Sequence, residues 1–284
     1  MEHSMSEVKL DGTDDGAVVL GAVQRQRAAP AAPMEDCVVR VDPRLVSLTA
    51  PDSLEAEQYL GLRYIVEQMR KPGGGVIVGI CSPTPGDGKS VTAINLVGAL
   101  ARDPKARVLL VEVDLRRSSV TSGEHLTLRY RDHRGLADAV RDTGLPLEKV
   151  IQPVPTFNFA VLPAGACPAA PYELLRSPRL GELLAQARQR YDYVILDAPP
   201  VVPVPDCRLI SKWVDGFFMV VAADRTPRAA LAEALNLLSP ESVLGLVFNR
   251  YDRSLARQYG YRSYGYTPAT NRKRRSWWTS LLRK

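Results

Sequence analysis

Lys89 and Ser90 close a glycine-containing loop, residues 82–90, which reads Ser-Pro-Thr-Pro-Gly-Asp-Gly-Lys-Ser. The loop follows the apolar run 75–80 and precedes a helical pattern over 91–100. In a strand–loop–helix unit of this kind, backbone N–H groups and the positive end of the helix dipole bind phosphate oxygens. The lysine can reach terminal phosphates, and the serine hydroxyl can ligate magnesium. The spacing therefore predicts a phosphate-binding loop.

Three carboxylates on two other apolar segments support this prediction, although Pro83 stands where the usual loop pattern begins with glycine. Glu112 and Asp114 lie two positions apart, so the period of a strand puts both on one face. Asp197 closes a second apolar segment, and we expect the prolines after it to end that strand. The carboxyl ends of parallel strands share one edge of a sheet, where ligands bind. One crevice is therefore expected to gather Lys89, Ser90, Glu112, Asp114 and Asp197.

Each assignment has a plainer alternative. The loop 82–90 could be an ordinary turn that opens a helix, and the two aspartates could be solvated carboxylates at strand ends. The combination of loop, helix and partner strands favours the phosphate site. For Glu112 the alternative stays open, because a salt bridge with Arg116 or Arg117 explains a glutamate there as well as a catalytic role does.

The rest of the chain predicts the elements that position these residues. Apolar runs alternate with amphipathic segments, which is typical of an α/β fold with a doubly wound, mainly parallel sheet. Strands are expected over 75–81, 107–113, 158–162, 192–197, 216–222 and 243–248. Helices are expected from Ser53 onward and over 88–102, 135–142, 178–190, 205–212 and 227–238.

Composition divides the 284 residues into three parts. Residues 1–50 mix acidic residues with glycine, alanine and proline without periodicity, which predicts a disordered arm. Residues 51–250 predict one compact domain, and residues 251–284 a tail. No apolar run approaches the ~20 residues of a membrane span, and the N-terminus lacks the features of a signal peptide. We therefore expect a cytoplasmic protein.

The tail is rich in tyrosine and strongly basic. From Arg250 onward, eight arginines and two lysines face one aspartate, in a chain whose formal net charge is +6. Such a segment suits an anionic membrane surface, nucleic-acid stacking or plain solvation. The basic run 272–275, followed by Trp277 and Trp278, could lie on anionic lipid, and a plain solvated charge run is the alternative; no nucleic-acid partner is expected.

Over residues 43–266 the chain resembles the cytoplasmic domain of the bacterial tyrosine kinases that regulate capsule and exopolysaccharide assembly. The likeness rests on the stretches 85–90, 112–117, 161–165, 173–178 and 191–200, on Asn249-Arg250 and on the terminal tyrosines. The resemblance implies a P-loop NTPase of the partition-ATPase-like type. It also implies an ATP- and magnesium-dependent protein-tyrosine autokinase.

The resemblance implies a role for each matching position. ATP would be bound by Pro85, Gly86, Asp87, Gly88, Lys89, Ser90 and Val91, with Asn249 at the adenine. Magnesium would be held by Ser90, Asp114 and Asp197. The catalytic set would be Lys89, Glu112 as candidate base, Asp114, Arg116 and Asp197. The acceptors would be Tyr251, Tyr259, Tyr261, Tyr264 and Tyr266.

The resemblance also implies partners. The chain would act at the inner face of the cell membrane with a separate polysaccharide co-polymerase, a chain-length-regulating membrane protein whose cytoplasmic tail docks on it. It would form a homo-oligomer whose copies phosphorylate one another. Each phosphate adds about −1.5 to −2 charge to the basic tail, so phosphorylation would change assembly.

Two departures from the family pattern keep other functions open. Glu112 stands where the family usually has aspartate, which moves the carboxylate by about 1.5 Å, and misplacement of that size costs about a hundredfold in rate. Leu60 replaces the first arginine of a Glu-x-x-Arg-x-x-Arg motif that the family uses in subunit contacts. One alternative is therefore a nucleotide-binding scaffold with impaired catalysis. A partition-type ATPase is another, although Thr84 stands where those proteins carry a second lysine.

Overall fold

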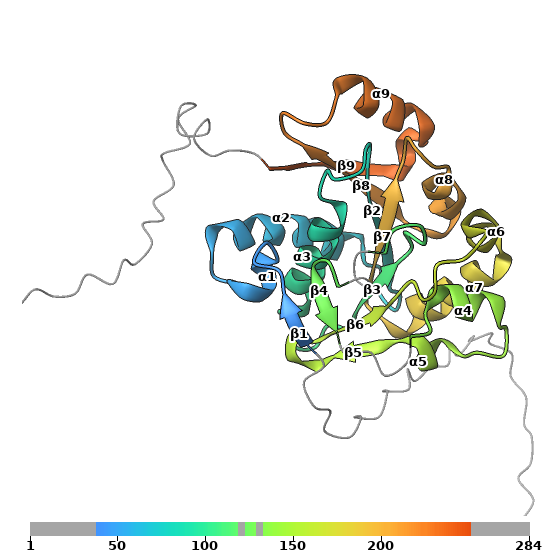
Figure 1. The fold of residues 1–284 in the computed structure, drawn as a ribbon. Helices are drawn as coiled ribbons and strands as arrows, with labels where there is room; N and C mark the ends of the chain where they lie inside the picture. Colours follow the sequence, from blue (N-terminus) through green and yellow to red (C-terminus); the bar gives the residue numbers. More distant parts are fainter. Residues whose placement is uncertain (1–37, 119–122, 129–132, 251–284) are drawn as a thin grey trace, which may run out of the picture. The chain divides into compact units, whose positions relative to one another are not determined.

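The computed structural model describes residues 38–118, 123–128 and 133–250. A seven-stranded sheet lies at its centre, in the order β5-β6-β3-β7-β2-β8-β9 (Figure 1). Its strands are β2 (Val76–Ser82), β3 (Val108–Glu112), β5 (Gln152–Val154), β6 (Phe159–Leu162), β7 (Tyr193–Pro200), β8 (Gly216–Ala222) and β9 (Val243–Asn249). Neighbouring strands are parallel except β5, which pairs antiparallel with β6 at one edge. The predicted doubly wound, mainly parallel sheet is confirmed.

Helices cover both faces of this sheet. On one face lie α1 (Val46–Thr49), α2 (Leu54–Met69) and α3 (Lys89–Ala101) (Figure 1). The remaining helices are α4 (Leu136–Arg141), α5 (Leu147–Val150), α6 (Pro171–Arg176), α7 (Pro178–Arg190), α8 (Asp206–Ile210) and α9 (Arg228–Leu237). Short 3-10 turns are η1 (Pro155–Phe157), η2 (Ser211–Trp213) and η3 (Pro240–Ser242). The predicted helix 205–212 is thus divided into α8 and η2.

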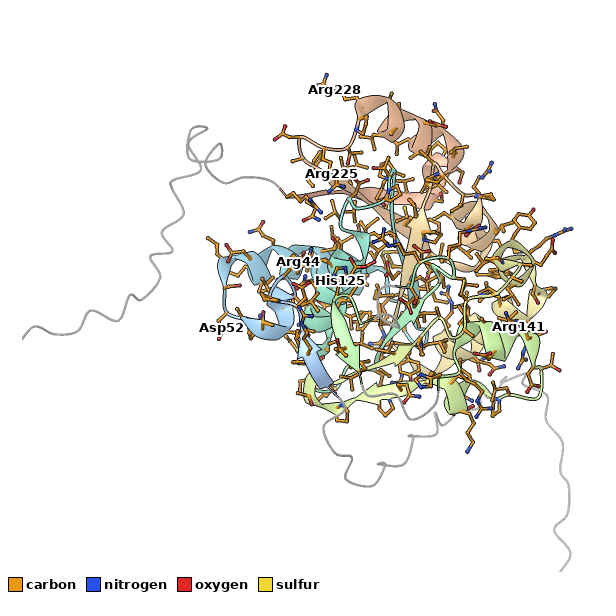
Figure 2. All side chains as sticks on the ribbon, viewed as in Figure 1. Arg44, Asp52, His125, Arg141, Arg225 and Arg228 are labelled. Atoms are coloured by element: carbon orange, nitrogen blue, oxygen red, sulfur yellow. The ribbon has the colours of Figure 1, made fainter. Side chains whose placement is uncertain are left out.

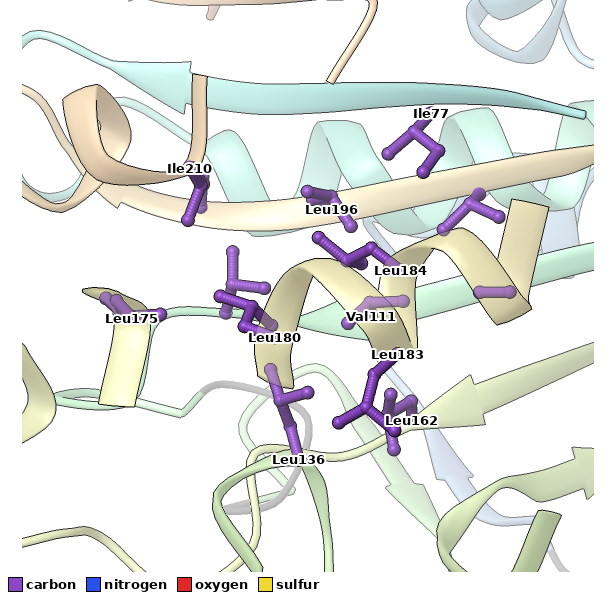
Figure 3. Close-up of a cluster of buried hydrophobic side chains, with 14 of the residues drawn as sticks. Ile77, Val111, Leu136, Leu162, Leu175, Leu180, Leu183, Leu184, Leu196 and Ile210 are labelled. Carbon is purple, nitrogen blue, oxygen red and sulfur yellow. The ribbon is translucent and has the colours of Figure 1, made fainter. Parts of the chain in front are cut away.

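Alternate strand residues enter two separate apolar cores. Val78 and Ile195 join the core under α2 and α3, whereas Ile77 and Leu196 join the core on the opposite face. Figure 3 shows the second core, where Leu184 of α7 packs with strand residues. Because both faces are covered, the strands are nearly continuous apolar runs rather than alternating ones.

Helix α2 begins where the sequence predicts. The Ser53 hydroxyl accepts the Ala56 N–H at 3.2 Å, which is the N-cap interaction that serine favours. Farther along α2, Arg63 pairs with Glu67 at 2.6 Å and donates to the Ala99 carbonyl of α3 at 2.9 Å. This arginine of the expected subunit-contact motif therefore holds α2 on α3 within one chain.

The expected disordered arm is wrong for residues 38–50. Strand β1 (Val38–Val41) pairs antiparallel with β4 (Leu126–Leu128), and Leu45 is wholly buried. Leu48 lies over Gly98 of α3, where a Cβ would be 2.7 Å from the leucine side chain. A few apolar side chains thus anchor this segment on α3, a contact too distant in sequence to give a periodic signal. Residues 1–37 lie outside the described ranges.

Strand β7 continues through the prolines that we expected to end it. Pro200 pairs with Ser82 of β2, and the ladder shifts register between Ile80 and Ser82. Such a bulge accommodates residues that cannot donate to a sheet. Asp197 therefore lies within the strand rather than at its end. Within the described ranges, the structure contains no helix with the length and apolar character that a bilayer crossing requires.

Candidate functional site

The loop 82–90 leads from β2 into α3, and its lysine reaches the carboxylates of two neighbouring strands. Lys89 Nζ lies 2.9 Å from Asp114 Oδ2 and 3.6 Å from Asp197 Oδ1. The same nitrogen is 3.4 Å from the Ser90 hydroxyl. All four side chains are buried or nearly so. The structure thus brings together the lysine, the serine and two of the three carboxylates that the sequence placed at one crevice.

Electrostatics keep this lysine charged. Burial alone would lower the pKa of Lys89, but the charges of Asp197 and Asp114 outweigh burial and raise it. A compact ammonium on a flexible stem can serve several anions in turn. The Lys89 ammonium therefore pairs with two aspartates in this structure and could pair with a phosphate when one is bound.

Two glycines shape the loop. Gly86 and Gly88 have φ of 85° and 103°, a region that side chains rarely adopt. A Cβ on Gly88 would also lie 1.9 Å from the Asn249 amide nitrogen. Pro85 is exposed and Val91 is half-buried, and their contacts with the cofactor stay predictions.

The Asp87 carboxylate braces the inside of the loop. It is wholly buried and accepts the Thr84 N–H at 2.9 Å and the Thr226 hydroxyl at 2.8 Å. The Thr84 hydroxyl also donates to it, at 2.9 Å. Asp87 was predicted to bind the cofactor. Its carboxylate instead accepts hydrogen bonds that stabilise the loop, so its backbone N–H is the group that could contact phosphate. Thr84, which replaces the second lysine of partition ATPases, takes part in this brace.

Three further residues near the loop were not predicted as cofactor or catalytic residues: Thr226, Arg225 and Arg250. Arg250 donates to the Gly86 carbonyl at 3.0 Å, and Arg225 lies where a Cβ on Gly86 would be 2.9 Å from its guanidinium. Asn249 donates to the Asp87 carbonyl at 2.9 Å, so its amide is engaged with the loop. Its adenine contact stays a prediction.

Glu112 ends β3 and is wholly buried beside Asp197 in the ladder. Its Oε2 accepts the Ala164 N–H at 3.1 Å, which ties β3 to the loop after β6. Arg116, one of the two arginines considered as its partner, makes a two-pronged bond to Asp206, at 3.0 and 3.2 Å. That bond raises the pKa of Arg116 and holds the segment after β3 against α8. The catalytic roles of Glu112 and Arg116 stay predictions.

The oxygen atoms at this edge suit magnesium in a particular way. Hard oxygen ligands bind it, and in nucleotide sites one or two carboxylates act together with phosphate oxygens and water. Ser90, Asp114 and Asp197 offer that small set. No cluster of three or more histidine, cysteine or carboxylate ligands is found among the described residues. A set of one serine and two carboxylates is typical of magnesium that is bound together with a nucleotide.

Comparison with known proteins agrees with this geometry. A family model described as an AAA domain matches residues 76–207, which include the loop and both carboxylate strands. The tyrosine-protein kinase YwqD of Bacillus subtilis (strain 168) is 32% identical over 224 residues, covering 78% of this chain and 92% of YwqD. The chain belongs to the bacterial tyrosine kinases. This membership favours the kinase interpretation over the partition-ATPase alternative.

A solved structure supports the same assignment. The kinase domain of the Escherichia coli tyrosine kinase ETK aligns with a TM-score of 0.66 and 25% sequence identity, covering 85% of this kinase and 89% of that chain. The predicted α/β P-loop NTPase fold is therefore confirmed, and the kinase is a nucleotide-binding protein.

Other relatives are much longer than this kinase. The succinoglycan biosynthesis transport protein ExoP of Rhizobium meliloti (strain 1021) is 29% identical over 221 residues. The match covers 75% of the kinase but 27% of ExoP. The predicted acceptor tyrosines, Tyr251, Tyr259, Tyr261, Tyr264 and Tyr266, lie outside the described residues.

Proposed function

We propose that this kinase is an ATP- and magnesium-dependent protein-tyrosine autokinase that acts in capsular or exopolysaccharide production. The observation that carries the proposal is the buried cluster of Lys89, Asp114 and Asp197 at the start of α3. A cation shared between two carboxylates is suited to exchange partners when phosphates arrive. Phosphoryl transfer needs chiefly such positioning and charge neutralisation.

In the proposed reaction, the N–H groups of the loop and Lys89 hold the terminal phosphates in line with a tyrosine oxygen. The new bond forms between that oxygen and the γ-phosphorus, while the bond to the β–γ bridging oxygen breaks and ADP leaves. The phenolic proton passes to a carboxylate, for which Glu112 is the candidate. Magnesium, when bound by Ser90, Asp114 and Asp197, would neutralise charge on the phosphate oxygens.

The acceptors in this proposal are the tail tyrosines of neighbouring copies, in a homo-oligomer. The partner is the cytoplasmic tail of a membrane co-polymerase, at the inner face of the membrane, with the basic tail of the kinase near anionic lipid. The name of ExoP, which refers to succinoglycan biosynthesis and transport, supports the polysaccharide pathway. Phosphorylation would reduce the positive charge of the tail and so alter assembly.

The test is intact-mass and phosphosite analysis of the purified kinase after incubation with magnesium and ATP, beside Lys89→Met. We expect phosphate on Tyr259, Tyr261, Tyr264 or Tyr266 in the parent protein alone. If neither protein gains phosphate, the experiment is repeated with the cytoplasmic segment of the membrane partner. Absence of phosphate there as well would replace the autokinase with a nucleotide-binding scaffold.

A further inference from the structure

We propose that Asn249 and Arg250 are positioning residues that orient two phosphate-binding N–H groups of the P-loop from outside. The inference deepens the proposed function and rests on the same nucleotide site. Asn249 is the last residue of β9 and Arg250 follows it directly, and Asn249 lies 162 residues beyond Asp87 in the sequence.

The contacts form a continuous brace. Arg250 Nη2 donates to the Gly86 carbonyl at 3.0 Å, and Asn249 Nδ2 donates to the next carbonyl, that of Asp87, at 2.9 Å. The Asn249 side-chain oxygen accepts the Arg250 N–H at 2.9 Å, which fixes the amide so that its nitrogen faces the loop. The Asn249 carbonyl in turn accepts the Ala223 N–H at 2.8 Å. Two successive loop carbonyls are thus held by one rigid strand end.

The geometry of the peptide bond explains how these hydrogen bonds orient the Asp87 and Gly88 N–H groups. In a planar trans peptide, the C=O of one residue and the N–H of the next point in opposite directions. A donor on the Gly86 carbonyl therefore turns the Asp87 N–H to the opposite side, and a donor on the Asp87 carbonyl does the same for the Gly88 N–H. Hydrogen-bond chains also polarise their members, so each aimed N–H becomes a better donor. These N–H groups lie in the part of the loop that cradles phosphates.

The position of the brace links the nucleotide site to the tail. Arg250 has a left-handed φ of 59°, and Tyr251 is the next residue. The side chain that donates to the Gly86 carbonyl therefore belongs to the residue directly before the tail. Arg225 is a neighbour of the same glycine, but its contact belongs to the turn after β8 and carries no bond to a loop carbonyl in the described structure.

The test is calorimetric titration of ADP and magnesium into the full-length chain and four variants. Asn249→Asp keeps the shape of the side chain but presents an oxygen to the Asp87 carbonyl, so we expect the largest loss of affinity, about tenfold or more. Arg250→Ala should weaken binding about fivefold, and Arg250→Lys should recover part of it because an ammonium can still donate. Both Arg250 variants leave the cost of the left-handed backbone unchanged.

Arg228→Ala is the matched control, because Arg228 projects outward from α9 (Figure 2) and should bind ADP like the parent. Melting temperatures within about 2 °C of the parent would separate positioning from loss of fold, and a raised KM for ATP with a smaller change in kcat is expected where phosphorylation is measured. Unchanged ADP affinity in Asn249→Asp and Arg250→Ala would overturn the inference. If the variants lose ADP affinity as expected but the parent forms no phosphotyrosine, the positioning role is supported and the autokinase proposal fails.

Discussion

Two buried aspartates, Asp192 just before β7 and Asp197 within it, lie toward opposite ends of that strand and are neutralised in different ways. Asp192 precedes β7 and accepts the Arg107 N–H at 3.0 Å and its guanidinium at 2.9 and 3.1 Å, with Arg70 at 2.5 Å. Asp197 faces the single ammonium of Lys89 at 3.6 Å, which Asp114 shares. Guanidinium forks fix a carboxylate in place, whereas an ammonium is a movable point charge. The first arrangement holds the fold, and the second can exchange partners.

The pKa directions follow the same division. For Asp192, burial raises the pKa, but the hydrogen bonds and charge of Arg107 together outweigh it and lower the pKa. Toward the other end of the strand it is the lysine that shifts, since Asp197 and Asp114 raise the pKa of Lys89 against the effect of burial. A substitution at Asp192 should therefore lower stability without changing activity, whereas a substitution at Lys89 should lower both.

The largest effect is expected for Lys89→Met. Without the ammonium, the terminal phosphates lose their protein cation, and the initial rate of phosphotyrosine formation should fall about a hundredfold or more, as when one charge-stabilising donor is removed. Mass spectrometry of timed samples measures that rate. Lys105→Met, at an exposed position, is the control and should match the parent. A rate within twofold of the parent in Lys89→Met would contradict the comparison.

Lys89→Met should also be less stable than the parent. Lys89→Met leaves Asp114 and Asp197 buried without their cation, which should lower the free energy of unfolding by about 3 kcal/mol. Adding Asp114→Asn removes one of the two charges. The double variant should regain stability without regaining activity.

Glu112→Asp should lower the rate about tenfold to a hundredfold. The shorter side chain draws the carboxylate back by about 1.5 Å from the Ala164 N–H, which it accepts at 3.1 Å. Glu112→Gln is the companion variant, because it keeps an acceptor at that N–H and removes the charge. A higher rate in Glu112→Asp would mean that the glutamate slows this kinase and would favour the scaffold interpretation.

Asp192→Ala is expected to lower stability and leave chemistry alone. Loss of the bonds from Arg107 and Arg70 should reduce the free energy of unfolding by about 2 kcal/mol, measured by urea denaturation. The rate per folded molecule should stay within twofold of the parent. Activity lost at temperatures where the variant is still folded would show that the two ends of the strand are not independent.

The smallest predicted effect is a pH dependence of the difference in stability between the parent and Asp192→Ala. Because the folded pKa of Asp192 lies below its unfolded value of about 3.9, its contribution is complete above that value and is lost as pH falls through the folded pKa. The stability gap between the parent and Asp192→Ala should therefore be constant near neutrality and narrow below about pH 4. Urea titrations at several pH values measure the gap. A gap that widens in acid would reverse the assigned direction.

The sequence by itself determined the loop, the alternation of strands and helices, and the meeting of Lys89 with Asp114 and Asp197. These depend on local signals, namely the spacing of the motif and the shared carboxyl edge of parallel strands. Burial on both faces also left apolar runs that were readable without any contact information. The tail tyrosines stay a prediction from sequence and family.

Only the tertiary structure decided which groups hold the loop from outside. Asn249, Arg250 and Thr226 reach the loop across 139 to 164 residues of chain, and no local pattern records such a pairing. The same holds for Arg116 with Asp206, for the packing of residues 38–50, and for a strand that passes two prolines at a bulge. A hydrogen bond depends on where the completed sheet brings two atoms together, and strand order sets that distance.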